Sequence, residues 1–369
     1  MFPLLPSRQR REQTSGAYRG RRTSASPSLP ALRLSRLEDE GPSHKILVVS
    51  PGDASEMVFA SALMPLLRAR YPRCEISMLC GPRSASIAAL IPDVDAIEMT
   101  AGNSNALWRG RGALGSFAQS VVRVRKEHFD IAVLLSPEWR ATLVATLAGA
   151  RRRIGHAGGL GDRFLTDVIA AGREIRPVLH ELTDLLAPLA IWKPELLRYQ
   201  LNAAPLSSRR ERFRLLLGSR PVSLRPFSAI RGESVDLKQW IRVAVELGRR
   251  GFDPLWIGSP SELNAVHRAA GSAAWRYVNK LGGGSSSDAA AAISLSHLFI
   301  GHDSSSLHLA GAFGVPVVGV YTPGQPMRRF PQGTGDSVML SRGSPAGVTS
   351  RDILSVVDEL PIAPRLQLV

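Results

Sequence analysis

Short apolar runs alternate with helix-period segments along the chain after residue 44, and this alternation is what most constrains the fold. Buried strands are predicted at 46–49, 75–79, 96–99, 130–135, 151–155, 221–224, 254–257, 293–300 and 315–321, with helical patterns in most of the intervals. Strands that alternate with helices indicate a parallel sheet covered by helices on both faces. The sequence therefore predicts the α/β class.

The alternation loosens around residues 199–208 and then resumes, which indicates a domain boundary. A length of 369 residues also favours two domains over one. We predict two doubly wound Rossmann-like domains, one at 44–203 and one at 204–350, whose strand ends face a shared cleft. The last segment, 351–369, begins with a helix, and an arrangement left open is that this helix packs back on the first domain.

Residues 1–43 are rich in Ser, Arg and Pro and show no sustained periodicity, so a disordered basic tail is predicted there. This segment holds eight Arg and four acidic residues, and its charge of +4 leaves +11 of the total +15 for the rest of the chain. Such a balance suits a phosphate-rich ligand, an acidic membrane surface or nucleic acid. Because no nucleic-acid-reading motif is present and aromatic residues make up only 6%, nucleic acid is not an expected partner.

Composition also indicates the cellular compartment in which the protein is expected. A hydrophobic content of 44% and a mean hydropathy of zero fit a globular protein, and no apolar run approaches the roughly 20 residues that span a bilayer. The N-terminus lacks the apolar core of a signal peptide. The cysteines, Cys74 and Cys80, fit a reducing compartment, and no metal-ligand spacing occurs. A cytoplasmic protein without a metal site is expected, with peripheral contact at the inner face of the membrane left open.

Residues 299–331 form the segment most suggestive of function, a strand, turn, helix and second strand. The turn carries Asp303, Ser304 and Ser305, and His308 follows in the first turn of the helix. Small residues allow a ligand to approach the backbone, and the amides at a helix N-terminus favour an anion. A phosphate-bearing ligand is one interpretation. The other is an ordinary strand-to-helix turn in which Asp or Ser only caps the helix.

Two further polar groups follow neighbouring strands of the second domain. Lys238 comes after the strand at 221–224, and Glu262 starts a helix after the strand at 254–257. A cation there could meet a phosphate, and a carboxylate could accept hydrogen bonds from ribose hydroxyls. Taken singly, each is equally well a solvated lysine or a first-turn acid that favours the helix dipole. Because parallel strands end at one edge of a sheet, the conjunction of these groups favours a nucleotide site.

The stretch DSSSLHLAGAFGVPVVGVYTPGQP, residues 303–326, resembles the Asp-Thr-Gly-x-x-His-Leu-Ala-Ala-Ala-x-Gly-x-Pro signature of glycosyltransferase family 9. That family includes the ADP-heptose:lipopolysaccharide heptosyltransferases. Weaker similarities are K-x-W at 238–240, G-x-x-x-E at 258–262, RRRIGH at 151–156 before FLT at 164–166, and the opening strand, loop and helix from residue 45. The resemblance covers residues 45–360.

The resemblance implies a GT-B glycosyltransferase that inverts the anomeric carbon without a metal. Its only small-molecule requirement would be a nucleotide-sugar donor, ADP-heptose by default, with an anionic glycolipid such as lipopolysaccharide core or another hydroxyl compound as acceptor. In the second domain, Lys238 and Ser304 with the amides near Ser305 would meet the diphosphate, Asp303 would orient the loop, His308 would support it, and Glu262 would take the ribose. In the first domain, Arg140 and Arg152 could meet an anionic acceptor.

The sequence departs from the family pattern at two places. Ser305 stands where the signature has glycine, so a side chain occupies a position of close backbone approach. The family's Gly-Asp base, counted without gaps from Lys45, falls on Ser55-Glu56, which predicts Glu56 as the catalytic base, with Asp53 as the second candidate. The alternative is that Glu56 is only an acidic residue in the first turn of a helix, where it favours the helix dipole.

These departures keep a second class of function open, namely a catalytically impaired protein of the same fold that binds nucleotide sugar or assists assembly. A sugar epimerase on this fold and a basic nucleic-acid binder are weaker alternatives.

Overall fold

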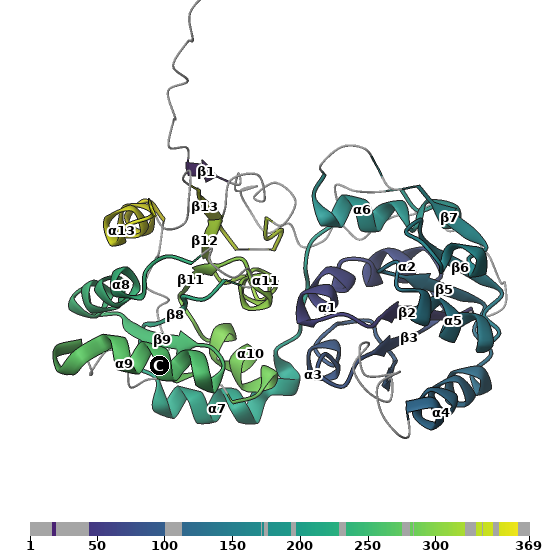
Figure 1. Ribbon diagram of the computed structural model, residues 1–369, viewed down its shortest axis with the longest axis horizontal. Coiled ribbons are helices and arrows are strands. Elements are labelled where there is room, and N and C mark those ends of the chain that lie inside the picture. Colours follow the sequence, from purple (N-terminus) through teal and green to yellow (C-terminus); the bar gives the residue numbers. More distant parts are fainter. Residues whose placement is uncertain are drawn as a thin grey trace, which may run out of the picture.

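The structure is a computed structural model that describes residues 17–19, 44–99, 113–170, 172, 176–192, 197–228, 234–274, 281–282, 284–321, 330–333, 335–341 and 347–360. Two α/β domains lie side by side, the first in purple to teal and the second in green to yellow (Figure 1). The predicted tail, 1–43, lies outside the described residues except for a short strand at its centre, β1 (Ala17–Arg19).

The first domain is built on a six-stranded parallel sheet with the order β4-β3-β2-β5-β6-β7. Its strands in chain order are β2 (Lys45–Ser50), β3 (Glu75–Cys80), β4 (Ala96–Met99), β5 (Ile131–Leu134), β6 (Arg152–His156) and β7 (Asp167–Ile169). Counted within the domain, this order is 3-2-1-4-5-6, the Rossmann arrangement, in which the chain reverses direction across the sheet between β2 and β5.

The second domain repeats that order. Its sheet runs β10-β9-β8-β11-β12-β13 with parallel neighbours, and β1 adds an antiparallel edge strand beside β13. The strands are β8 (Pro221–Arg225), β9 (Asp253–Ile257), β10 (Leu281–Gly282), β11 (Leu298–His302), β12 (Val317–Tyr321) and β13 (Ser337–Ser341). The prediction of two doubly wound domains is confirmed.

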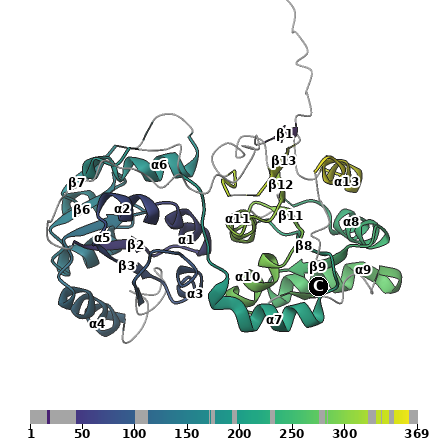
Figure 2. The same ribbon diagram turned by 180° about the vertical axis from the view of Figure 1, so that it is seen from behind.

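Helices cover the faces of both sheets (Figures 1 and 2). Those of the first domain are α1 (Ala54–Ser61), α2 (Met64–Arg70), α3 (Ala85–Ala88), α4 (Ala113–Lys126), α5 (Trp139–Leu147) and α6 (Val178–Asp184). Those of the second are α7 (Ser207–Leu216), α8 (Leu237–Arg249), α9 (Pro260–Ala274), α10 (Ser286–Ser294), α11 (Ser305–Ala312) and α13 (Ser350–Glu359).

Two helices differ from the sequence prediction. The single helix expected up to Arg70 is divided into α1 and α2, with Pro65 in the first turn of α2, where its missing N–H costs nothing. The helix near the C-terminus, α13, packs against α8, β12 and β13 of its own domain rather than on the first domain (Figure 1). The arrangement left open for that helix is therefore corrected.

A continuous hydrophobic core joins the two domains. The contact is made mainly by α1 of the first domain against α11 of the second, with a smaller one between α3 and α10. One buried cluster accordingly includes Phe59 and Tyr199 from the first part of the chain together with Leu307 and Leu309 from α11. Figures 1 and 2 both show α1 facing α11 at the centre of the molecule.

Helix α1 begins with a side-chain cap. Asp53 is exposed, has an extended backbone, and accepts hydrogen bonds through Oδ1 from the amides of Ser55 (2.9 Å) and Glu56 (3.4 Å). An aspartate at this position satisfies amides that have no partner within the helix and favours the positive end of the helix dipole. The geometry gives Asp53 a structural role at the start of the helix that contacts the other domain.

We expect Asp53→Ala to lower the free energy of unfolding by about 1 kcal/mol, because a lost N-cap costs that much in most proteins. Chemical denaturation followed by circular dichroism measures the change. Asp53→Ser, which keeps an acceptor oxygen at the cap, is the matched control and should stay close to the wild type. Equal stability of Asp53→Ala and the wild type would contradict the capping role.

Candidate functional site

The topology gives each domain one point at which a ligand-binding crevice is expected. In doubly wound sheets ligands bind outside the carboxyl ends of the strands, at the point where the strand order reverses. In the first domain this point lies between β2 and β5, which lead to Glu56 and Arg140. In the second it lies between β8 and β11, which lead to Lys238 and Ser304.

The contact between α1 and α11 joins the two switch points, since these helices follow β2 and β11 directly. Its centre is His308, whose side chain is 1% exposed. The imidazole ring meets Phe59 edge to face, with centroids 4.8 Å apart, and lies 5.9 Å from the ring of Tyr199. His308 Nε2 also lies 3.4 Å from the Asp303 carboxylate. His308 thus connects the turn before α11 to the first domain.

The turn between β11 and α11 has the geometry of an anion site. Ser304 is the residue that precedes the helix; its backbone is extended, and its side chain makes no capping hydrogen bond. The hydroxyl oxygen of Ser304 is buried and has no hydrogen-bond partner among the described residues. Ser305 and Ser306 form the first turn of the helix, where backbone amides lack intrahelical acceptors. This combination of an unused hydroxyl and a helix N-terminus suits a phosphate oxygen.

Lys238 lies in the first turn of α8, whose N-cap is Asp236; the Asp236 carboxylate accepts a hydrogen bond from the Lys238 amide at 2.9 Å. The lysine side chain is exposed, and it forms no ion pair with any other residue in the described ranges. Its charge is therefore available to a ligand at the carboxyl edge of β8. The local structure is equally that of a helix-start lysine, so its role stays a prediction.

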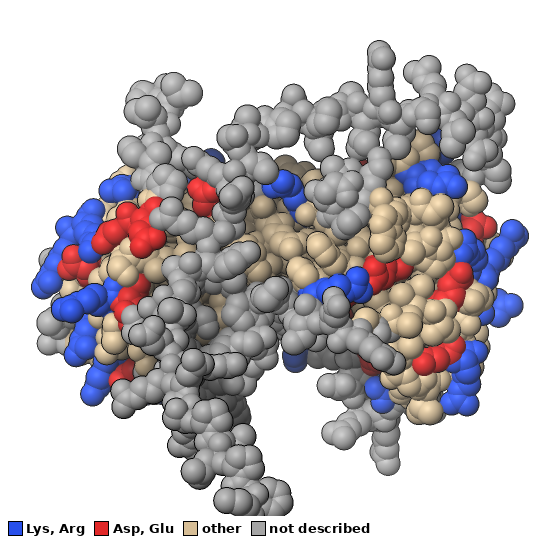
Figure 3. All heavy atoms as spheres, turned by 90° about the horizontal axis from the view of Figure 1, so that it is seen from above, with Lys and Arg blue, Asp and Glu red and all other residues tan. Residues whose placement is uncertain are grey.

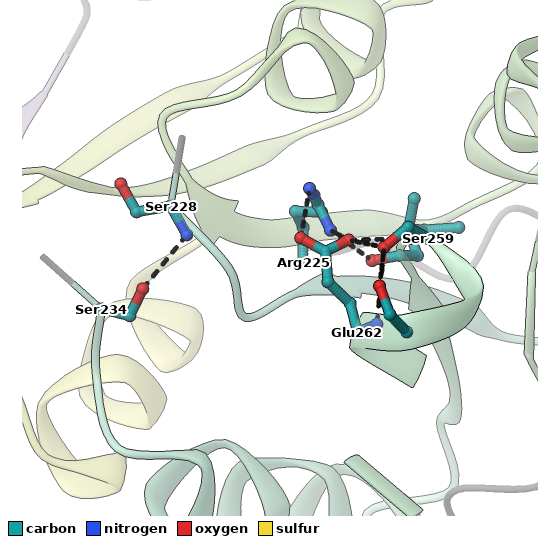
Figure 4. Close-up of polar contacts among 7 residues, drawn as sticks. Arg225, Ser228, Ser234, Ser259 and Glu262 are labelled. Carbon is teal, nitrogen blue, oxygen red and sulfur yellow. Dashed lines mark hydrogen bonds and ion pairs between the residues drawn. The ribbon is translucent and has the colours of Figure 1, made fainter. Parts of the chain in front are cut away.

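Glu262 is held by an arginine that the sequence did not single out. Arg225, the last residue of β8, donates from Nη1 and Nη2 to the two carboxylate oxygens at 2.7 and 3.1 Å, and the Ser259 amide donates to Oε2 at 2.7 Å (Figure 4). Burial alone would raise the pKa of Glu262, but these hydrogen bonds hold it below its ordinary value. Glu262 is thus a fixed anion at the end of β9, and Oε1, which accepts from Arg225, keeps acceptor capacity for a ligand hydroxyl.

The environments of the two candidate bases differ sharply. Asp53 is exposed and occupied with capping. Glu56 is half-buried, and its Oε2 accepts a hydrogen bond from the Ser50 hydroxyl at 2.8 Å. Burial raises the pKa of Glu56 above its ordinary value; the charges of Asp53 and Glu138 act in the same direction, while hydrogen bonds from Ser50 and the Gly52 backbone oppose it. A raised pKa means that the ionised carboxylate binds a proton more strongly, and such a shift is typical of a general base.

Arg140 shares the crevice of Glu56, but Arg152 does not. Arg140 pairs with Glu138 at 3.5 Å, and its Nε is buried without a hydrogen-bond partner among the residues that are described. Arg152 opens β6, at the amino edge of the sheet, and forms an ion pair with Asp167 at 2.7 Å. The structure therefore separates the two arginines that were predicted to meet an acceptor, and the position of Arg152 gives that role no support.

The sequence did not single out three residues that contact the candidate site residues, namely Ser50, Glu138 and Arg225. Glu138 and Arg225 could have been found as charged residues that follow predicted strands. The hydrogen bond of Ser50 depends on the path of the loop and leaves no pattern in the sequence. Within the described ranges, no group of three or more His, Cys, Asp or Glu side chains could hold a metal ion. The same ranges contain no helix of the length and apolarity that a membrane span requires.

The chain is similar in sequence to curated heptosyltransferases. Lipopolysaccharide heptosyltransferase 2 of Escherichia coli is 25% identical over 312 residues, which cover 76% of this chain and 84% of that protein. Lipooligosaccharide heptosyltransferase 2 of Haemophilus influenzae is 21% identical over 346 residues, covering 86% and 97%.

Solved structures show the same fold. The structure of E. coli ADP-heptose lps heptosyltransferase II matches with a TM-score of 0.71 at 19% identity, covering 85% of this chain and 97% of that one. E. coli heptosyltransferase WaaC with ADP matches with a TM-score of 0.69 at 12% identity, covering 85% and 99%. The family model for glycosyltransferase family 9 (heptosyltransferase) matches residues 118–347, well over half of the chain. The chain therefore belongs to glycosyltransferase family 9 and is a glycosyltransferase with the two-domain GT-B fold.

Proposed function

We propose that this chain is an inverting, metal-independent heptosyltransferase that moves heptose from ADP-heptose onto a hydroxyl of a lipopolysaccharide core acceptor. The observation that carries the proposal is a carboxylate with a raised pKa, Glu56, at one switch point and the N-terminus of α11 at the other, where the buried Ser304 hydroxyl has no hydrogen-bond partner among the described residues. The helices that carry the two, α1 and α11, pack against each other. The names of the curated relatives support heptose and lipopolysaccharide as the substrate classes.

On the donor side, the leaving group is a nucleoside diphosphate on which negative charge develops as the glycosidic bond breaks. Lys238 and the amides at the start of α11 would stabilise that charge, and the Ser304 hydroxyl would donate to a phosphate oxygen. Asp303 and His308 would hold the turn in place, and Glu262 would accept from the ribose hydroxyls. Protein groups thus supply the positive charge, which is the reason for proposing a mechanism without a metal.

On the acceptor side, Glu56 would remove the proton from the attacking hydroxyl. A single displacement from the face opposite the leaving group inverts the anomeric carbon, and NMR of the product tests that stereochemistry. Arg140, with an unused buried Nε, would bind an anionic group of the acceptor.

Ser305 adds a side chain at the first residue of α11, on the donor side. If that side chain crowds the diphosphate, the Ser305→Gly protein should bind the donor at least as tightly as the wild type.

We expect Glu56→Gln to lower the rate of heptose transfer by on the order of a hundredfold to ten-thousandfold, the usual contribution of a general base. Mass spectrometry of an acceptor incubated with ADP-heptose measures the product. Asp53→Asn, which keeps the cap oxygen, should retain most activity. If Asp53→Asn is the damaging change and Glu56→Gln is not, the base is misassigned.

Stability separates this loss from misfolding. The pKa of Glu56 is higher in the folded protein than in the unfolded chain, so as pH rises the unfolded chain loses this proton at a lower pH than the folded protein. The free energy of unfolding of the wild type therefore falls as pH rises from the unfolded-state pKa to the folded-state pKa. Glutamine carries no charge at any pH. The Glu56→Gln protein should therefore unfold at the same or a higher denaturant concentration than the wild type at pH 7.5, with the difference narrowing below pH 4.5.

Gly52 offers a second way to disturb the base without removing it. A methyl group added at residue 52 would overlap the carboxyl group of Glu56, whereas one added at Gly81 would only touch the Pro51 carbonyl at 3.7 Å. We expect Gly52→Ala to displace the carboxylate and lower the turnover number about a hundredfold, since a shift of ~1 Å can cost that much. Gly81→Ala is the control. Wild-type turnover in Gly52→Ala would mean that the observed position of Glu56 is not the working one.

Contact with an acidic membrane surface is a further part of the proposal. Lys and Arg side chains gather at the outer end of each domain on the face seen in Figure 3. In the second domain, four arginines line a groove of about 560 Å³ between α8 and α13: Arg242, Arg249, Arg250 and Arg351. We expect the protein to sediment with anionic vesicles and not with neutral ones. Added salt should weaken this binding, and so should the double substitution of Arg242→Ala and Arg351→Ala. Equal sedimentation with both kinds of vesicle would contradict it.

A further inference from the structure

His302 is a buried polar residue next to the donor crevice that the proposed chemistry does not use. It is the last residue of β11, directly before the turn that carries Asp303 and Ser304, and it is 2% exposed. Its ring meets that of Trp240, in α8, with centroids 5.6 Å apart. His302 therefore lies between the two elements that are proposed to bind the diphosphate.

The hydrogen bonds of His302 define a single protonation state. Nε2 lies 3.1 Å from the amide of Val235, which can only donate, so Nε2 must accept. Nδ1 lies 3.3 Å from the carbonyl oxygen of Val320, which can only accept, so Nδ1 must carry the proton. Both contacts are satisfied only by the neutral ring with hydrogen on Nδ1. Burial lowers the pKa of His302 to about 4; the Val320 carbonyl and Asp303 oppose this shift, and the charge of Arg225 adds to it.

The position of Val235 gives these bonds their importance. Val235 precedes Asp236, the N-cap of α8, and Lys238 follows in the first helical turn. The bond from Val235 to His302 therefore ties the start of α8 to the end of β11. On the other side of the ring, Val320 belongs to β12, which pairs with β11 in the sheet. The imidazole thus connects the start of α8 to the rigid centre of the sheet.

We propose that His302 is a positioning residue for the donor, which holds the start of α8, and with it Lys238, at a fixed place relative to the N-terminus of α11. The inference rests on the proposed function in one respect, that the ligand spanning these two elements is a nucleoside diphosphate. Without the Val235 contact, the segment that leads into α8 loses its attachment to β11, and Lys238 reaches the diphosphate only after an ordering step that weakens binding.

Two substitutions divide the role of His302 between its nitrogens. In His302→Gln the amide oxygen reaches the place of Nε2 and can accept from Val235. In His302→Asn the shorter amide reaches the place of Nδ1, so it can donate to Val320 but leaves the Val235 amide buried without an acceptor. The pair therefore keeps a polar group of similar burial and differs in which bond survives.

The experiment measures ADP binding to the full chain at pH 7.5 by calorimetry, together with the hydrogen exchange of residues 234–240 and the kinetics of transfer. We expect His302→Asn to bind ADP about tenfold more weakly than the wild type, to exchange faster in this segment, and to show a raised KM for donor with kcat little changed. His302→Gln should stay within about twofold of the wild type. Equal ADP affinity in the wild type and both variants would overturn the proposal.

Failure of the proposed function has a different signature, because the wild type itself would then not bind ADP, and the donor role of His302 would fall with it. If His302→Asn does not fold, the tautomer of His302 in the wild type still tests the proposal. Nitrogen chemical shifts of labelled histidine in the wild type should show His302 neutral with hydrogen on Nδ1 at pH 7.5. Hydrogen on Nε2, or a protonated ring, would exclude the bond from Val235 and overturn the proposal.

Discussion

The packing of α1 against α11 is the contact on which the site depends. These helices follow β2 and β11, the strands that flank the two switch points, so whatever fixes one helix on the other also fixes the two crevices opposite each other. The contact is buried and aromatic at its centre, where the rings of His308, Phe59 and Tyr199 pack against one another. Because His308 also faces the Asp303 carboxylate, the turn that would bind phosphate and the interface between the domains share one side chain.

The first turn of α1 shows how position alone assigns different tasks to two acids three residues apart. Asp53 projects from the N-cap into solvent, where a charged carboxylate is stabilised by helix amides. Glu56 turns inward against Gly52 and Ser50, where burial disfavours the charge and raises its pKa. A glycine at residue 52 leaves the space that the Glu56 carboxyl group occupies. The loop sequence Pro-Gly-Asp-Ala-Ser-Glu therefore contains the N-cap Asp53, the candidate base Glu56 and the glycine, Gly52, that leaves room for the Glu56 carboxyl group.

The strand order was predictable because alternating strands and helices permit few topologies, and the residues that follow each strand then fall at one edge. That reasoning located Lys238 and the 303–308 turn at one edge, whereas Glu56 came from the spacing of the family pattern, and the roles of all of them stay predictions. It could not find the bonds of His302 or Ser50, which depend on the path of loops and on side-chain distances. The acceptor role of Arg152 came from the family resemblance alone. The strand predicted at 151–155 already put this residue near the start of a strand, and in the structure it begins β6 and pairs with Asp167.

In the proposed mechanism the two domains would meet different electrostatic requirements of glycosyl transfer. In the second domain the acids near the crevice have partners, as Glu262 has in Arg225, and the buried His302 is neutral, which leaves the exposed Lys238 and the helix amides to face a departing anion. In the first domain the raised pKa of Glu56 makes its carboxylate a stronger proton acceptor than an exposed glutamate. In the proposed mechanism each domain would therefore stabilise one part of the charge that develops in the reaction, and the contact of α1 with α11 would bring the two parts together.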